Sequence, residues 1–196
     1  YTPDANFNGV DSFEYSLDDG AGGTDIGSVT LTVRPVNDDP DARDDTVALD
    51  EDSAVTGNLL ADNGSGADSD TDGDRLSVAQ NLVQGVANGI LTFDRDGAFT
   101  YTPVANFNGT DRFVYTLSDG VGGTDIATVT FTVAAINDAP NAASDVIQGV
   151  EDTIITGDVL ADNGSGEDSD IDGNTLTVNE TPVRTVANGV LILNSD

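Results

Sequence analysis

Residues 109–134 read GTDRFVYTLSDGVGGTDIATVTFTVA, and this stretch decides the fold class. Large apolar side chains fall on every second position, as in Phe113, Tyr115 and Leu117, with Arg112, Val114 and Thr116 between them. A period of two is typical of β-strands that bury one face. The stretch therefore predicts two strands, residues 111–118 and 124–134, joined by a turn that begins at an Asp-Gly pair.

Upstream segments show the same β-type pattern between turn residues. We expect five more strands, at residues 46–49, 54–60, 76–83, 89–93 and 98–102. The Asp-Gly pair in residues 94–97 predicts a hairpin turn between the last two. Apolar residues make up 37% of the chain, which is enough for a core, so the alternative that its charge indicates disorder is disfavoured. The prediction is an all-β protein of seven-stranded, immunoglobulin-like or cadherin-like sandwiches.

The chain repeats itself after 100 residues. Residues 1–9, YTPDANFNG, recur as YTPVANFNG at residues 101–109, and aligning residues 1–96 with 101–196 needs no gap and gives 53 identities. A period near 100 is about the length of one immunoglobulin-like sandwich of roughly 100 residues. The sequence therefore predicts tandem sandwich domains.

The tetrapeptide Asn-Asp-x-Pro, at residues 37–40 and 137–140, indicates the domain boundaries. Proline cannot continue a strand ladder, so the motif is interpreted as a linker. Residues 37–136 are then one complete repeat. Residues 1–36 are the C-terminal strands of a preceding repeat, and residues 137–196 are the N-terminal part of a following one.

The composition excludes many functions. There are 36 Asp plus Glu against six Arg, with no Lys, His or Cys, and the formal net charge is -30. No Ser-His-Asp triad, usual zinc site, disulfide or Schiff base can be built, and nucleic acid would be repelled. No apolar run is long enough for direct membrane insertion. A glycosidase with paired carboxylates is the least favoured function, because a small sandwich offers no evident cleft, so no enzymatic role is expected.

Alternating aspartates followed by glycine form the sharpest local motif. Residues 68–74 read DSDTDGD and residues 168–174 read DSDIDGN. Three carboxylates on one side of a tight loop are the oxygen ligands that Ca²⁺ prefers, and no nitrogen or sulfur ligand exists in this chain. The alternative is a solvated turn, since aspartate favours turns. We expect calcium or a similar hard ion at Asp68, Asp70 and Asp72, and at Asp168, Asp170 and Asp172.

A longer string resembles a known family. The pattern NFNGxDxFxYxLxDGxGGTD, followed by VTxTV and NDxP, is similar to the cadherin-like tandem repeats (VCBS type) of large bacterial adhesins. The resemblance covers the whole chain, and it implies calcium at each domain junction. It assigns to the first junction Asp11, Asn37, Asp38, one or more of Asp68, Asp70 and Asp72, and Asp119. It assigns to the second Glu51, Asp111, Asn137, Asp138 and one or more of Asp168, Asp170 and Asp172, with Glu151 as the periodic counterpart of Glu51.

These observations predict a calcium-rigidified structural segment of a bacterial extracellular adhesin stalk or surface fibre. Its expected partners are calcium and neighbouring repeats, and its expected location is extracellular, at the bacterial cell surface. A polysaccharide-binding module is one alternative, although the chain has no Trp and Phe113 and Tyr115 share the inward face with Leu117. A second alternative is a filament in which residues 1–36 of one copy complete the sandwich begun by residues 137–196 of another.

Overall fold

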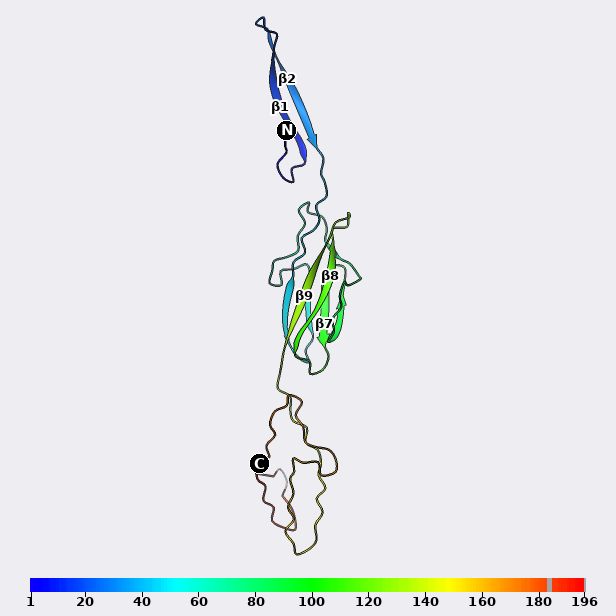
Figure 1. Cartoon of the computed structure of the whole chain (residues 1–196), viewed down its shortest axis with the longest axis vertical. Coiled ribbons are helices and arrows are strands. Elements are labelled where there is room, and N and C mark those ends of the chain that lie inside the picture. The colour runs from blue at the N-terminus through cyan, green and yellow to red at the C-terminus, as the bar shows by residue number, and fades with distance from the viewer. Residues whose placement is uncertain (183–184, 196) are drawn as a thin grey trace. The chain divides into compact units, whose positions relative to one another are not determined.

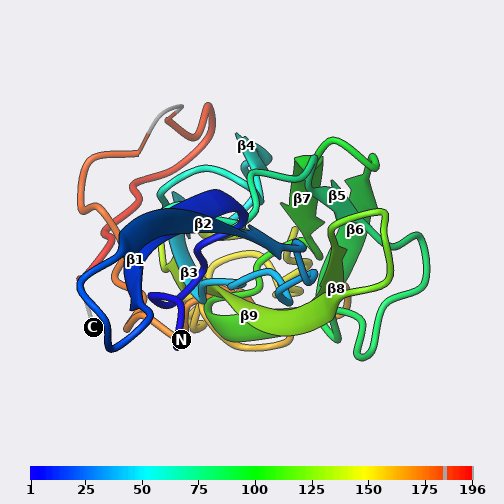
Figure 2. The same ribbon diagram turned by 90° about the horizontal axis from the view of Figure 1, so that it is seen from above.

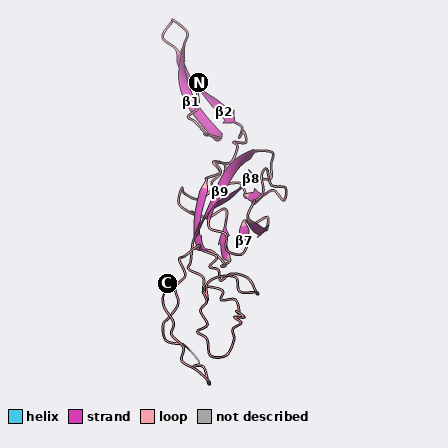
Figure 3. Ribbon diagram, turned by 60° about the horizontal axis from the view of Figure 1, so that its bottom comes forward, coloured by secondary structure: helices cyan, strands magenta, loops and turns pink. Residues whose placement is uncertain are grey.

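The computed structural model of the chain describes residues 1–182 and 185–195. Within these residues the protein has nine strands and no helix. The chain divides into two compact units, Tyr1–Ala134 and Ala135–Asp196. All nine strands belong to the first unit, as the colouring in Figure 3 makes clear.

The first unit contains a hairpin followed by a seven-stranded domain. The hairpin strands are β1 (Gly9–Asp18) and β2 (Thr24–Val33). The domain strands are β3 (Asp45–Asp50), β4 (Val55–Asn58), β5 (Ser77–Val78), β6 (Gly89–Phe93), β7 (Ala98–Pro103), β8 (Gly109–Ser118) and β9 (Thr124–Ala134). Each of the seven strands expected in the complete repeat is present; β6 and β9 have the predicted bounds, and the bounds of the other five differ.

The central domain, which comprises β3 to β9, has two sheets. One has the strand order β3-β9-β8-β5 and the other β4-β7-β6. Only β3 and β9 pair in parallel, with Asp45 opposite Val129, and the other pairs are antiparallel. Figures 1 and 2 show β7 and β9 in different layers of this domain. The predicted all-β sandwich is confirmed.

Aromatic side chains from both sheets form the core. Phe113, Tyr115 and Leu117 on β8 are fully buried, as their period of two predicted. Tyr101 on β7 stacks against Phe131 on β9, with ring centroids 3.9 Å apart. Stacked and tilted aromatic pairs stabilise a core beyond their buried area. These contacts hold the two layers of the central domain together.

Strand β5 is much shorter than the expected strand at residues 76–83. Ala79 donates its N–H to the carbonyl of Thr116, and Val83 donates to that of Val114. Gln84, the bridge partner of Val114, lies five residues after Ala79, whereas Val114 and Thr116 are two residues apart, so three extra residues bulge out of the ladder. A bulge of this kind ends regular pairing. The residues still follow β8, but only Ser77 and Val78 form a strand.

The predicted turn at residues 94–97 joins β6 to β7. Asp94 donates its N–H to the carbonyl of Ala98 at 2.8 Å, and Gly97 has φ of +85°. That φ suits glycine, and a Cβ at this position would also lie only 2.9 Å from the Leu60 side chain. The sequence prediction of a hairpin here is confirmed.

The β1–β2 hairpin is a copy of β8–β9 in the same register. Gly9 pairs with Val33 as Gly109 pairs with Val133. Its apolar face is nevertheless open: Phe13, Tyr15 and Leu17 are 51%, 47% and 65% exposed, whereas their copies in β8 are fully buried. The difference arises because β8 and β9 are covered by the second sheet of the central domain.

Residues 135–196 form a separate unit with no regular strand among its described residues. One isolated bridge joins Asn141 to Ser169, as Asp41 is joined to Ser69 in the first unit. In the central domain β3 pairs with β9, and β5 with β8. Within the described residues of the second unit, no segment forms ladders equivalent to those of β3 with β9 and of β5 with β8.

Candidate metal centre

The linker and the aspartate loop meet at the end of the central domain where β8 ends and β9 begins. The amide nitrogen of Asn37 donates to Asp119 Oδ2 at 2.7 Å, and the N–H of Asp38 donates to Asp72 Oδ2 at 2.7 Å. Asp41 and Ser69 exchange two backbone hydrogen bonds, of 2.8 and 3.1 Å. The first-junction residues Asn37, Asp38, Asp72 and Asp119 therefore belong to one hydrogen-bonded cluster.

Three carboxylates of the loop converge on one another. An oxygen from each of Asp70, Asp72 and Asp74 lies within 4.8 Å of the others. Asp70 organises the loop, because its Oδ1 accepts the N–H groups of Asp72 and Asp74 at 2.9 and 3.1 Å, while Gly73 turns the chain with φ of +77°. Asp70 Oδ2 is buried and has no hydrogen-bond partner.

The electrostatics of this cluster reflect a surplus of negative charge. Partial burial, followed by repulsion from Asp70, Asp72 and Asp119, raises the pKa of Asp74. The pKa of Asp119 is lowered, mainly by the hydrogen bond from Asn37 and further by the N–H groups of the glycine turn after it. No Arg forms an ion pair with this group in the described residues, where the exposed pair Arg43–Asp41 is the one salt bridge.

These donors fit a hard cation. All are oxygens, at least three carboxylates are close enough to share one ion, and one buried oxygen lacks a donor. Oxygen ligands of this kind suit Ca²⁺, which accepts irregular coordination, better than Mg²⁺, which demands an octahedron. When bound, the ion would neutralise the cluster and connect the linker to the loop.

Asp68 lies apart from this group although it belongs to the same motif. Its Oδ1 accepts the N–H of Arg43 at 2.7 Å, and its Oδ2 accepts the buried hydroxyl of Tyr115 at 3.0 Å. Burial raises the pKa of Asp68. The motif thus directs one aspartate toward the sandwich and three toward the linker.

Asp111 and Glu51, predicted for the second junction, are buried residues of the central domain. Asp111 accepts four hydrogen bonds, from the N–H groups of Ala87, Asn88 and Arg112 and from the Tyr101 hydroxyl. These donors hold its pKa below the usual value, despite the opposing effect of burial. They also occupy its oxygens, which favours a structural role.

The remaining predicted ligands occupy three places. Asp11 is exposed on β1, where its Oδ1 accepts the N–H of Ser12 at 2.8 Å. Glu51 follows β3 directly, and its N–H donates to the carbonyl of Ala134 at 2.9 Å. Glu151 is an exposed turn residue of the second unit.

The second unit repeats the linker-to-loop contacts. Asp138 donates its N–H to Asp172 Oδ2 at 2.7 Å, and Asp170 Oδ1 accepts the N–H groups of Asp172 and Asn174 at 3.0 and 3.1 Å. Asn137 accepts a hydrogen bond from the Asn174 side chain. Asp168 accepts the N–H of Ala143, as its copy accepts that of Arg43. The two units therefore build the same local frame independently.

Two acidic residues near the first cluster were missed by the sequence prediction. Asp74 completes the three-carboxylate group, and its place at the end of the DSDTDGD motif was the available signal. Asp39 lies beside Asp119, because a Cβ added to Gly123 would collide with the Asp119 carboxylate and stand 2.9 Å from Asp39 Oδ1. Nothing in the sequence distinguishes Asp39, whose copy is Ala139.

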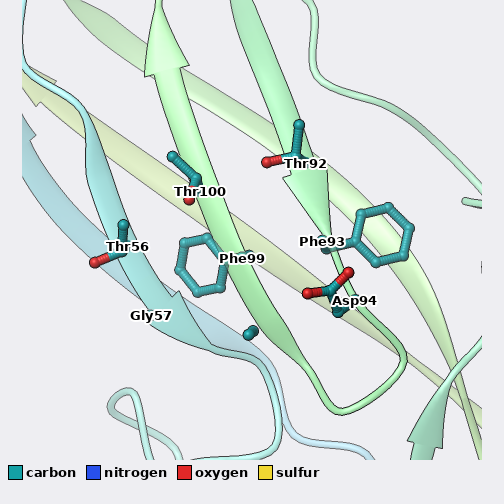
Figure 4. Close-up of a pocket in the computed structure, with 8 residues that line it drawn as sticks. Thr56, Gly57, Thr92, Phe93, Asp94, Phe99 and Thr100 are labelled. Atoms are coloured by element: carbon teal, nitrogen blue, oxygen red, sulfur yellow. The ribbon is translucent and has the colours of Figure 1, made fainter.

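A shallow hollow on the β4-β7-β6 sheet is the other surface feature of note. It is lined by threonines together with Phe93, Asp94 and Phe99 (Figure 4). Phe99 is only 4% exposed and lies against Gly57. Phe93, which is partly exposed, is therefore the ring in this hollow on which a sugar could stack.

A comparison with family sequence models identifies the fold family. The model described as bacterial Ig domain matches residues 1–32 and 37–132, which is more than half of the chain. The chain belongs to the bacterial Ig domain family. Such domains are typical of extracellular and surface proteins. This membership confirms a bacterial immunoglobulin-like repeat, and the narrower cadherin-like assignment stays a prediction.

Solved structures similar to this Ig-domain chain include two glycoside hydrolases. The endo-fucoidan hydrolase MfFcnA4 from glycoside hydrolase family 107 is 20% identical, with a TM-score of 0.38, over 68% of this chain and 20% of that one. The endo-fucoidan hydrolase MfFcnA9 is 19% identical, with a TM-score of 0.33, over 67% and 23%. The chain thus spans about a fifth of the length of these enzymes.

Two further searches gave negative results. A search of curated protein sequences finds no match to this chain. Within the described residues of this Ig-domain chain, no helix has the length and apolar character needed to cross a membrane.

Proposed function

We propose that this chain is a calcium-rigidified structural segment of a bacterial extracellular adhesin stalk or surface fibre, without catalysis. The observation that supports it most is the convergence of Asp70, Asp72 and Asp74 at the point where the linker residue Asp38 is hydrogen-bonded. Without a cation these carboxylates repel one another and loosen the linker. With calcium, the linker and the loop share one ion, and the joint stiffens.

A calcium titration of thermal stability tests this function. A ligand that binds only the folded state stabilises it by about 2.7 kcal/mol at 100 times its Kd. We expect the melting temperature of the chain to rise with calcium and to fall again with chelator, whereas Asp72→Asn with Asp172→Asn should weaken the response. The exposed Asp50→Asn serves as the matched control. A melting temperature of the unmodified chain that does not change with calcium would falsify the proposal.

Assembly into a filament is a second candidate, favoured by the open face of the β1–β2 hairpin. In the central domain Val47, Val55 and Leu91 pack against the buried core to which this face contributes. Their copies Ile147, Ile155 and Leu191 are 43%, 55% and 45% exposed in the second unit. We propose that residues 137–196 of a second copy of this chain cover the apolar face of the hairpin.

The path of the chain through the central domain disfavours an arrangement in which residues 137–196 cover the hairpin of their own chain. The preceding linker is tied to Asp119, before β9 begins, and the chain leaves the domain after Ala134, at the far end of β9. These 11 residues of strand span about 36 Å. The linker before the central domain and the segment after it therefore join opposite ends of β9.

Engineered disulfides test this assembly, because the chain has no cysteine. Ala48 pairs with Thr132 in the parallel β3–β9 ladder, and the repeat places Gln148 opposite Thr32 of another copy. Gln148→Cys with Thr32→Cys should give disulfide-linked multimers, whereas Ala48→Cys with Thr132→Cys should give only crosslinked monomer. Crosslinking of the first pair within single chains, or its absence at high protein concentration, would contradict the assembly.

Polysaccharide binding stays an alternative prediction. Most aromatic residues of the central domain are buried, including Phe113, Tyr115 and Phe131, whereas Phe93 and Phe107 are partly exposed. Sugar recognition by stacking needs exposed rings. A screen of the chain against surface polysaccharides tests this alternative, and saturable binding would establish it.

A further inference from the structure

Asp45, the first residue of β3, is an acidic side chain that neither the predicted junctions nor the proposed function uses. It is 2% exposed, and neither of its carboxylate oxygens has a hydrogen-bond partner. An isolated buried carboxylate costs several kcal/mol of stability in its charged form. A buried acid with no donor therefore requires a physical explanation.

The surroundings of Asp45 are acidic and rich in oxygen. Asp68 and Asp44 are the charged groups that act on it, and both are negative. Asp68 accepts the hydroxyl of Tyr115, and that hydroxyl also lies near the Leu59 carbonyl, at 3.3 Å. Burial is the main cause that raises the pKa of Asp45, to about 6.

No side chain of the described residues supplies the missing positive charge. Asn63 approaches Asp45 and favours its charged form. The Asn63 side-chain nitrogen, however, donates to the carbonyls of Asn58 and Ala61, at 2.8 and 3.2 Å. The one salt bridge in the described part of the chain is the exposed Arg43–Asp41 pair.

The same frame recurs in the second copy of the motif. Within residues 41–50, only Ala42 and Asp45 are repeated 100 residues later. Thr46 donates its N–H to the Asn63 carbonyl at 3.1 Å, and Val146 donates to that of Asn163 at 3.3 Å. The aspartate and the backbone hydrogen bond next to it therefore occur in both copies, although most of the surrounding residues differ.

We propose that Asp45 and Asp68 bind a metal cation inside the sandwich, beneath the loop of residues 63–68. This buried site is distinct from the surface cluster of Asp70, Asp72 and Asp74. Its ligands are carboxylate oxygens, with the carbonyl of Leu59 and water available to complete the shell. A ligand set made of oxygens alone selects a hard ion of the calcium type. The central domain then holds one structural ion in its body and another at its linker.

Terbium is a direct probe of this site, because Tb³⁺ replaces Ca²⁺ at oxygen sites and emits when a nearby tyrosine is excited. The chain has four Tyr and no Trp, and the Tyr115 hydroxyl is hydrogen-bonded to Asp68. We expect tyrosine-sensitised Tb³⁺ emission that calcium displaces. Asp45→Asn should abolish most of this emission, and Asp72→Asn, which alters only the linker cluster, should preserve it.

Two further variants keep the test decisive. Tyr115→Phe should bind the same number of ions as the unmodified chain by calorimetry but lose the emission, whereas Tyr101→Phe should retain it. In chelator at pH 7, Asp45→Asn should melt at a higher temperature than the unmodified chain, because it removes an unpaired buried charge. In calcium the order should reverse.

The outcomes separate this site from the proposed function. An Asp45→Asn variant that binds as many ions as the unmodified chain and keeps the emission would overturn the buried site. The buried site would also be overturned if Asp45→Asn raised the melting temperature by the same amount with and without calcium. Loss of calcium-dependent stiffening in Asp72→Asn with the emission intact would leave the buried site standing and identify the linker ion separately.

Discussion

At the scale of single residues, the aspartates of the DSDTDGD motif at residues 68–74 have two different roles, and the geometry of the strands decides which aspartate has which role. Asp68 and Asp70 are two positions apart, yet one accepts the Tyr115 hydroxyl and the other organises the loop through its own Oδ1. Such a division cannot be predicted from the spacing of aspartates, because it depends on where β8 places its tyrosine. The sequence identified the chemistry of the motif, and the structure separates its members.

Gly123 is predicted to be essential for the linker cluster. A Cβ there would collide with the Asp119 carboxylate and crowd Asp39 Oδ1 at 2.9 Å. Gly123→Ala should therefore displace Asp119 and weaken calcium binding at the linker, measured by calorimetry. Gly85→Ala is the control, because no atom lies within 4 Å of its Cβ position. Equal calcium affinity in the two variants would show that Asp119 takes no part in the site.

The Tyr101 hydroxyl is predicted to stabilise the central domain through Asp111. The two groups are 3.0 Å apart, and the hydrogen bond between them is buried. Tyr101→Phe should cost about 1.5–3 kcal/mol, the range for hydrogen bonds to charged groups. Chemical denaturation of the central domain measures this cost. Tyr1→Phe, at the exposed copy of the position, should have little effect, and an equal loss in both variants would contradict the role of burial.

At the scale of elements, identical sequence patterns have different surroundings. The β1–β2 hairpin and the β8–β9 pair share their register, but only the second pair is covered by β7 and its neighbours. A two-stranded hairpin alone is marginally stable in water. The stability of these strands therefore comes from the layer that covers them.

Hydrogen exchange should reveal this difference directly. In dilute solution, where copies do not associate, the amides of β1 and β2 should exchange at least about a hundredfold faster than their copies in β8 and β9, since local opening free energies differ by several kcal/mol. At high protein concentration the assembly proposed for the hairpin face should reduce this difference in exchange rate. Equal protection in dilute solution would contradict the account of the hairpin.

Much of the fold could be predicted from the sequence because alternation is a local property. The alternation of Phe113, Tyr115 and Leu117 predicted both the strand and its buried face. The Asp-Gly pair predicted the β6–β7 turn. The bulge that shortens β5 could not be predicted, because it depends on the count of residues against β8. The absence of strands in the described part of residues 135–196 could not be predicted either, because alternation is local and the pairing of strands is not.

The candidate site was predicted with similar limits. Asp70, Asp72, Asn37, Asp38 and Asp119 were named from the motif, the repeat and the family resemblance, and the structure places them in one hydrogen-bonded cluster or beside it. Asp45 was overlooked, because an aspartate at the start of a strand has no distinguishing pattern. Its importance follows from burial, which only the packed domain shows.

At the scale of the whole molecule, the net charge of -30 acquires a structural meaning under the proposed function. Part of the charge is concentrated at the Asn-Asp linkers and the aspartate loops, which recur every 100 residues. Bound calcium would neutralise these groups in proportion to the number of repeats. A long chain of such domains would then be stiff in calcium and flexible without it.

Small-angle scattering of the 196-residue chain with calcium and with chelator tests this central claim most directly. We predict that calcium narrows the distribution of end-to-end distances and increases the apparent persistence of the chain. Asp72→Asn with Asp172→Asn should scatter in calcium as the unmodified chain does in chelator. Indistinguishable scattering of the unmodified chain in the two conditions would contradict the account.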